Sequence, residues 1–172
     1  MSQSLSRRQF LKAGGATAAG IAVSPLVHAK EAPPATDPGA TVLPYPRKAL
    51  GSTGKLAVNT PVDFTFPDEF SPCVLVKMGH AVPGGVGPER DIVAYSKLCT
   101  HMGCPTWYDQ ETRTFRCGCH FSVFDPEMGG QMVCGQATEN LPKIVLEYDA
   151  QGGGLTAVAV EGLIYGRQSN LL

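Results

Sequence analysis

The chain has 172 residues, of which 43% are hydrophobic and 17% charged, so it can form a packed domain and is not disordered throughout. Its formal net charge of -1 argues against a nucleic-acid partner, which would require a clustered excess of lysine and arginine. The 20 glycines and 14 prolines favour a loop-rich β domain over a helical bundle, and the six cysteines and four histidines are the unusual part of the composition.

Residues 1–29 have the pattern of a twin-arginine export signal. The sequence S-R-R-Q-F-L-K begins at Ser6, and a weakly apolar run follows over residues 13–27. The segment ends in V-H-A, a small-residue cleavage pattern. We therefore expect this leader to be removed on export to the bacterial periplasm.

A retained membrane anchor is the alternative interpretation of the apolar run. As a helix, its 15 residues would rise about 22 Å, which is short of the roughly 30 Å hydrocarbon core of a bilayer. Membrane association is therefore not favoured. Export by this pathway also suits a cysteine-rich protein, because a metal centre can be assembled in the reducing cytoplasm before the folded chain is exported.

Residues 30–48 read as an extended, proline-rich arm or linker, with prolines at positions 33, 34, 38, 44 and 46. The sequence leaves open whether this arm is disordered or lies across a partner subunit. We expect the folded domain over residues 49–172.

The folded domain is expected to consist of short antiparallel strands and turns. Apolar runs bounded by glycine and proline predict strands over residues 73–78, 91–95, 107–108, 114–116, 122–124, 143–148 and 155–160. The polar segment 109–112 and the glycines at 152–154 each predict a hairpin turn. The chain shows no long helical periodicity and no internal repeat, so we predict an all-β fold, an antiparallel β-sandwich or barrel.

Two cysteine–histidine motifs flank the first of these hairpins. C-T-H-M-G-C begins at Cys99, and C-G-C-H-F-S begins at Cys117. Each motif offers one thiolate and one imidazole, Cys99 with His101 and Cys117 with His120, and the hairpin would bring the two loops side by side. Two thiolates and two imidazoles suit either tetrahedral zinc or a [2Fe–2S] cluster with both cysteines on one iron and both histidines on the other.

The two remaining cysteines of these motifs, Cys104 and Cys119, favour the cluster over zinc. A structural zinc site needs no additional pair of cysteines. Two loops that project from a sheet around a partly exposed cluster do need a clamp.

The two motifs resemble those of the Rieske iron–sulfur family, over roughly residues 94–145. By that resemblance Cys99 and Cys117 bind one iron of a [2Fe–2S] cluster, and His101 and His120 bind the other. The implied fold is a Rieske-type sandwich or barrel with a smaller cluster-binding subdomain inserted.

The resemblance also implies a disulfide between Cys104 and Cys119, as in the high-potential branch of the family. Such a bond closes a loop of about 15 residues and contributes on the order of 3 kcal/mol. The segment G-Q-A-T-E-N-L-P at residues 135–142 resembles the loop that covers the cluster in that branch. The cluster-binding loops are thus expected within about residues 97–142.

Residues in and just after the second motif are expected to set the reduction potential of the cluster. Ser122 matches the family's serine and should donate its hydroxyl to a cluster sulfur, which favours the reduced state. Phe124 stands where quinol-oxidising members usually carry tyrosine, so one hydroxyl donor is absent. Gly118 and Phe121 occupy positions where proline and glycine are usual. Because the hydroxyl is absent at position 124, we expect a lower reduction potential than in relatives that carry tyrosine there.

Taken together, the leader, the short chain and these motifs resemble the small subunit of bacterial arsenite oxidases. The resemblance implies a non-catalytic electron-transfer subunit of an oxidoreductase, with no substrate chemistry on this chain. The implied partners are a large molybdopterin subunit with a [3Fe–4S] cluster and, as electron acceptor, a periplasmic cytochrome c or azurin. The alternatives are the Rieske subunit of a quinol-oxidising cytochrome bc complex and a zinc-binding interaction module.

A few residues near the motifs carry weaker expectations. Cys73 and Cys134 could form a second disulfide, but buried thiols are favoured because free cysteine is commonly buried. His80 is expected on the surface or in ordinary packing, and Met102 at an exposed docking face.

Five aromatic residues surround the motifs and could form a dry shell around the cluster or merely pack the hairpin. They are Trp107, Tyr108, Phe115, Phe121 and Phe124.

Overall fold

The computed structural model describes residues 44–171. The expected leader and most of the expected arm lie outside these described residues. The described part contains two short 3-10 helices, η1 (Thr53–Lys55) and η2 (Pro126–Met128). Its strands are β1 (Lys48–Ser52), β2 (Pro61–Thr65), β3 (Pro72–Lys77), β4 (Ile92–Ser96), β5 (Thr106–Asp109), β6 (Thr114–Cys117), β7 (Val123–Asp125), β8 (Gln131–Cys134), β9 (Lys143–Tyr148) and β10 (Gly154–Glu161).

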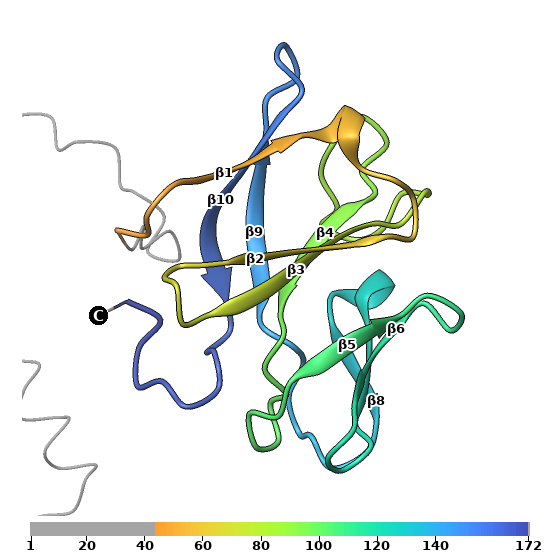
Figure 1. Cartoon of the computed structure of the whole chain (residues 1–172), viewed down its shortest axis with the longest axis vertical. Helices are drawn as coiled ribbons and strands as arrows, with labels where there is room; N and C mark the ends of the chain where they lie inside the picture. Colours follow the sequence, from red (N-terminus) through yellow and green to blue (C-terminus); the bar gives the residue numbers. More distant parts are fainter. Residues whose placement is uncertain (1–43, 172) are drawn as a thin grey trace, which may run out of the picture. The chain divides into compact units, whose positions relative to one another are not determined.

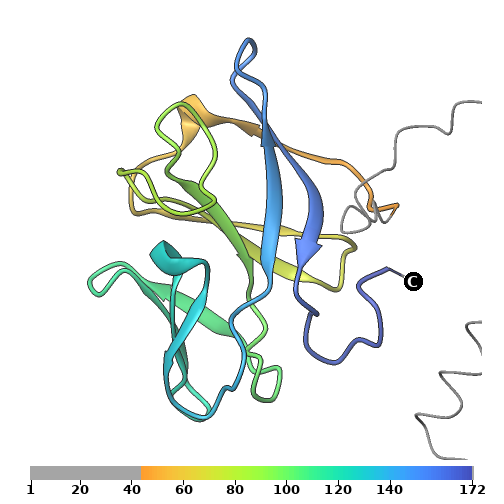
Figure 2. The same cartoon turned by 180° about the vertical axis from the view of Figure 1, so that it is seen from behind.

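The strands form two antiparallel sheets (Figures 1 and 2). The larger sheet has six strands in the order β1-β10-β9-β4-β3-β2, and the smaller has four in the order β5-β6-β7-β8. The two edge strands of the larger sheet approach each other, because Lys48 Nζ on β1 donates to Thr65 Oγ1 on β2 at 2.9 Å. The larger sheet is thus nearly closed into a barrel, and the smaller sheet is the inserted subdomain.

The middle strands of the larger sheet are buried on both faces. Cys73 and Leu75 on β3 face a core inside the barrel, whereas Val74 and Val76 face a second core. This second core lies between the sheets and includes Tyr95 on β4 together with side chains of the small sheet. Burial on two faces explains why residues 73–76 form a continuous apolar run rather than an alternating one.

Polar contacts fasten the small sheet to the barrel. The hydroxyl of Tyr95 donates to the Pro126 carbonyl at 2.8 Å, and the hydroxyl of Tyr108 donates to Asn59 Oδ1 at 2.7 Å. Burial raises the pKa of both phenols, so both remain neutral donors at neutral pH. The position of the small sheet, which carries the second motif, is therefore set by packing and by directional bonds.

The predicted all-β fold with an inserted subdomain is confirmed, as are both predicted hairpins. The sequence patterns did not single out β1, β2 or β8 individually. Residues 44–48, which were assigned to the expected arm, are among the described residues. Tyr45 stacks on Phe66 with ring centroids 6.1 Å apart, so the last residues of the expected arm pack on the barrel.

No helix within residues 44–171 has the length and apolar character needed to cross a membrane.

Candidate metal centre

The β5–β6 hairpin places the two cysteine–histidine loops beside each other. Thr106, just after the first loop, pairs with Cys117, which opens the second loop. The first loop is closed by two backbone bonds, from the Cys99 amide to the Cys104 carbonyl at 2.9 Å and from the Gly103 amide to the Cys99 carbonyl at 2.8 Å. Both motifs therefore meet at one end of the small sheet, as the hairpin prediction requires.

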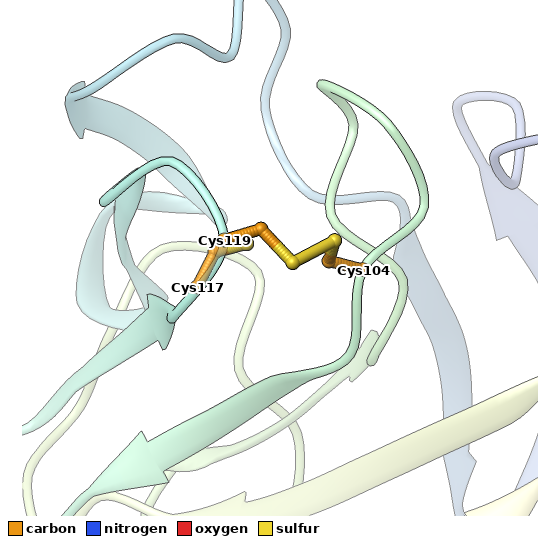
Figure 3. A group of neighbouring side chains, drawn as sticks. All are labelled: Cys104, Cys117 and Cys119. Atoms are coloured by element: carbon orange, nitrogen blue, oxygen red, sulfur yellow. A yellow bond between two sulfur atoms is a disulfide. The ribbon is translucent and has the colours of Figure 1, made fainter.

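A disulfide joins the two loops (Figure 3). It connects Cys104 with Cys119 across a Cα–Cα distance of 6.5 Å. The Cys117 sulfur lies within 4.8 Å of both disulfide sulfurs, but this trio is not a metal site, because two of its members are bonded to each other and cannot act as thiolates. The disulfide therefore serves as a clamp beside Cys117.

The two motif histidines point at one another. The Nδ1 atoms of His101 and His120 are 3.2 Å apart, and the ring planes are nearly perpendicular, at 86°. His101 is half-buried and His120 is exposed. Two Nδ1 atoms that converge while one ring remains at the surface could serve as a pair of metal ligands at the solvent edge of the site.

The other two motif cysteines form a buried pair. Cys99 and Cys117 are 0% and 3% exposed, and Cys117 is near enough to influence the pKa of Cys99. Burial raises the pKa of Cys99, and the neighbouring Cys117 raises it further, whereas the His101 backbone and the Ser122 side chain act to lower it. Because metals bind the thiolate, these two groups stabilise the anionic form that ligation requires.

This separation into pairs discriminates between the two candidate centres. Within residues 44–171, the four expected ligands do not form a set whose donor atoms all lie within 4.8 Å of one another. A single zinc with bonds of about 2.0–2.3 Å would hold any two ligands less than about 4.6 Å apart. A sulfur pair beside a separate nitrogen pair instead fits a [2Fe–2S] cluster with unlike irons.

The loop between β8 and β9 ties the two ligand loops together. The Ser122 hydroxyl oxygen accepts from the amides of Gln136 at 3.1 Å and Ala137 at 3.0 Å. The Thr100 hydroxyl donates to the Glu139 carbonyl at 2.8 Å. This third loop, which contains the expected G-Q-A-T-E-N-L-P segment, therefore holds both motifs.

The expectation of a shell made by all five aromatic residues needs correction. Tyr108, Phe115 and Phe124 are buried in the core that also contains Cys99 and Cys117, whereas Trp107 is 50% and Phe121 is 78% exposed.

The two exposed rings line a surface groove of about 320 Å³ beside Cys117. Phe121 projects outward because it occupies a left-handed backbone conformation, with φ of 61°, at the tip of the second loop. Water is therefore excluded only from the inner side of the site, where the buried aromatic residues pack.

The weaker expectations for individual residues near the motifs are only partly confirmed. The expectation of two buried thiols is right for Cys73 and wrong for Cys134, which lies exposed at the end of the edge strand β8. His80 is at the surface and contacts Glu127, with Nε2 and Oε2 3.1 Å apart. Met102 is exposed, as expected for a residue at a docking face.

One residue that touches the first ligand loop is absent from the sequence candidates. Tyr165, in the segment after β10, packs against Gly103. The sequence did carry one signal for this contact, the apolar stretch G-L-I-Y-G at residues 162–166. A solvent-exposed segment would be polar, so an apolar stretch here indicates packing against the domain.

Comparison with known proteins agrees with this geometry. The family model of the Rieske [2Fe-2S] domain matches residues 52–145, and that of the twin-arginine translocation pathway signal sequence matches residues 4–24. The iodate reductase subunit IdrB of Denitromonas iodatirespirans is 38% identical over 174 residues, which cover 96% of this chain and 86% of that protein.

Two further relatives are more limited matches. The Rieske iron-sulfur subunit of the cytochrome bc1 complex of Corynebacterium diphtheriae is 44% identical over 63 residues, which cover 36% of this chain and 16% of that protein. The soluble domain of Rieske protein II from Sulfolobus acidocaldarius is similar in fold, with a TM-score of 0.63 and 23% identity, over 72% of this chain and 82% of that one.

Proposed function

The chain belongs to the Rieske [2Fe–2S] family, and from that premise we propose that Cys99 and Cys117 bind one iron of its cluster while His101 and His120 bind the other. The support is the pairing seen in the structure, with buried thiols on one side and converging Nδ1 atoms on the other. The cluster, when bound, takes up and gives back one electron at a time.

The protein's own residues control where that electron passes. The thiol pair is sealed beneath buried aromatic rings, whereas His120 reaches the surface. The histidine edge is therefore the shortest route from the cluster to a partner, and the Ser122 hydroxyl and the surrounding backbone amides stabilise the charge on the sulfurs.

The chain is an electron-transfer subunit of an oxidoreductase, and its twin-arginine signal directs export to the periplasm. Our proposal is that its catalytic partner is a large molybdopterin subunit that oxidises arsenite, with a cytochrome c or azurin as the electron acceptor. The support is the combination of leader, short chain, C-T-H-M-G-C, C-G-C-H-F-S and G-Q-A-T-E-N-L-P.

A second candidate is iodate reduction, in which electrons flow through this chain toward the large subunit. It is favoured by the 38% identity to an iodate reductase subunit over nearly the whole chain. The substrate would bind to the partner in both cases, so the two candidates differ in the direction of electron flow past the same cluster.

The cytochrome bc alternative has less support. The similarity to the bc1 subunit covers 36% of this chain, and Phe124 replaces the tyrosine expected of quinol-oxidising members. The zinc alternative has less support, because the donor atoms of the four expected ligands do not all lie within 4.8 Å of one another among the described residues.

Purification of the native complex tests the proposal. We expect molybdenum and iron in the complex, a rhombic electron paramagnetic resonance (EPR) signal on reduction, and anaerobic reduction of the cluster by arsenite. Reoxidation of the dithionite-reduced complex by iodate, without reduction by arsenite, would select the second candidate. His120→Ala and Cys117→Ala should each abolish the EPR signal, and its retention in either variant would refute the ligand assignment.

A further inference from the structure

The segment after β10 delivers an aromatic ring to the first ligand loop. In both overall views the chain beyond β10 lies beside the loop that precedes β5 (Figures 1 and 2). A Cβ built on Gly103 would lie 2.4 Å from Cδ1 and 2.8 Å from Cε1 of Tyr165. The ring therefore lies directly against the Gly103 backbone, and no larger residue at position 103 fits without displacing it.

The backbone that carries this ring, which is itself 40% exposed, is anchored independently of the ligand loop. Ile164, next to Tyr165, is fully buried in the barrel core, and its amide donates to Asn170 Oδ1 at 2.9 Å. The Arg167 guanidinium donates to Asp68 Oδ1 at 2.8 Å. These contacts anchor the C-terminal segment on both sides of Tyr165, so the barrel holds the backbone from which the ring projects.

The ring touches the backbone of Gly103, which forms the turn at the end of the first motif. Gly103 has a φ of 71°, a left-handed conformation that glycine adopts without strain, and its amide donates to the Cys99 carbonyl. The next residue, Cys104, is held by the disulfide. A ring against Gly103 therefore restrains the turn that joins Cys99 to the clamp.

We propose that Tyr165 is a positioning residue for the cluster, which keeps the first ligand loop closed and limits the access of water to it. The inference rests on the proposed function, because it takes Cys99 and His101 as ligands. Removal of the ring should let the loop open and admit water. Reduction adds one negative charge to the cluster, and water stabilises that charge, so the reduction potential should rise.

The test uses the cluster-loaded full-length chain and the variants Tyr165→Ala and Tyr165→Phe. Loss of the visible absorbance in the presence of a chelator, below the unfolding temperature, should be about fivefold faster in Tyr165→Ala, the rate change that corresponds to roughly 1 kcal/mol of aromatic packing. Tyr165→Phe retains the ring and should restore both the rate and the midpoint potential. Leu163→Ala, which truncates an exposed apolar side chain of the same segment, is the matched control and should behave as wild type.

A second pair of variants isolates the contact itself. Gly103→Ala should destabilise the cluster in the wild-type background, because the new methyl group collides with the ring and a side chain is strained at a φ of 71°, a strain that is the same in both backgrounds. The same substitution should cost clearly less in the Tyr165→Ala background, where the space is open. Equal effects in the two backgrounds, or a Tyr165→Ala protein with wild-type bleaching and potential, would overturn the inference.

These outcomes are distinct from a failure of the proposed function. A wild-type chain without a Rieske EPR signal would remove the ligand assignment and this inference with it. A wild-type chain with the signal, but without arsenite or iodate activity in its complex, would remove only the proposed substrates.

Discussion

The Ser122 hydroxyl stabilises the third loop and is also expected to influence the reduction potential of the cluster. Its oxygen accepts two amide hydrogens of the third loop, and its side chain acts to lower the pKa of Cys99. Gly135 is required beside it, since a Cβ there would lie 2.3 Å from Ser122 Cα. The hydroxyl is fully buried, and both of its acceptor positions are used.

Ser122→Ala should therefore have two effects. The midpoint potential should fall, because a donor to the cluster sulfur is lost. The free energy of unfolding should drop by about 1–3 kcal/mol, because two amides lose their acceptor. Protein-film voltammetry and chemical denaturation measure the two effects. An unchanged potential would contradict the assignment of this donor.

Phe124→Tyr should change the midpoint potential of the cluster in the opposite direction. Phe124 is fully buried in the core that contains Cys99 and Cys117. A hydroxyl added there should donate toward a cluster sulfur and raise the midpoint potential. If the hydroxyl found no acceptor, the variant would instead lose about 1–3 kcal/mol of stability with no rise in potential, and this account of position 124 would be wrong.

At the scale of elements, the site is a set of three loops tied to one another. The β5–β6 register aligns the first two loops, the disulfide clamps them, and the third loop is bonded to both through Ser122 and Thr100. The clamp and the ligands therefore have separable roles.

Replacement of both Cys104 and Cys119 by serine should lower stability without removing the cluster. The expected loss is on the order of 3 kcal/mol, the entropic contribution of a closed loop of about 15 residues. The double variant is preferable to Cys104→Ser alone, since a free thiol at position 119 would lie next to Cys117. Thermal unfolding and EPR spectra are the measurements, and a lost Rieske signal would show that the disulfide is needed for ligation itself.

The two free cysteines outside the site occupy different elements and should differ in reactivity. Burial raises the pKa of Cys73, on the inner strand β3, to about 12, whereas Cys134 is exposed at the end of the edge strand β8. Since the thiolate is the nucleophile, Cys73 should resist alkylation at pH 8 until the protein unfolds. Iodoacetamide labelling of the holoprotein followed by mass spectrometry should modify Cys134 alone. Labelling of Cys73 at the same rate would contradict the buried position of β3.

At the scale of the whole molecule, an ion pair between Arg167 and Asp68 fastens the C-terminal segment to the barrel, and Tyr165 of the same segment contacts the first motif loop. Burial acts to raise the pKa of Asp68, but bonds from Arg167, the Phe70 amide and Ser71 outweigh it, and the pKa lies below its ordinary value of 3.8. A carboxyl group whose pKa is lowered in the folded state stabilises that state above its unfolded pKa. This contribution disappears as the pH falls through the folded-state pKa.

Asp68→Asn should therefore reduce stability at pH 6 and make little difference well below pH 3.8. Thermal unfolding of the wild type and the variant, followed by circular dichroism across this range, gives the comparison. A difference in melting temperature that stayed constant with pH would show that the charge of Asp68 contributes nothing.

The sequence predicted the local features of the molecule well and its long-range contacts poorly. Residues 143–148 and the β5–β6 hairpin were predictable, because strand periodicity and turn residues are local signals. The motif spacing likewise indicated which side chains gather at one site. The edge strands β1, β2 and β8 were not singled out, since their exposed residues carry weak patterns. The Tyr165–Gly103 contact joins positions far apart in the chain, and no local pattern encodes it.

The burial of Cys99 and Cys117 within the core between the two sheets has a consequence for biogenesis. The two cysteines that we propose as iron ligands also complete the packing that joins the subdomain to the barrel. Metal insertion and the final consolidation of the fold should therefore be coupled events. A transport route that accepts only folded cargo would then act as quality control, and chains that failed to acquire their irons would tend to be retained in the cytoplasm.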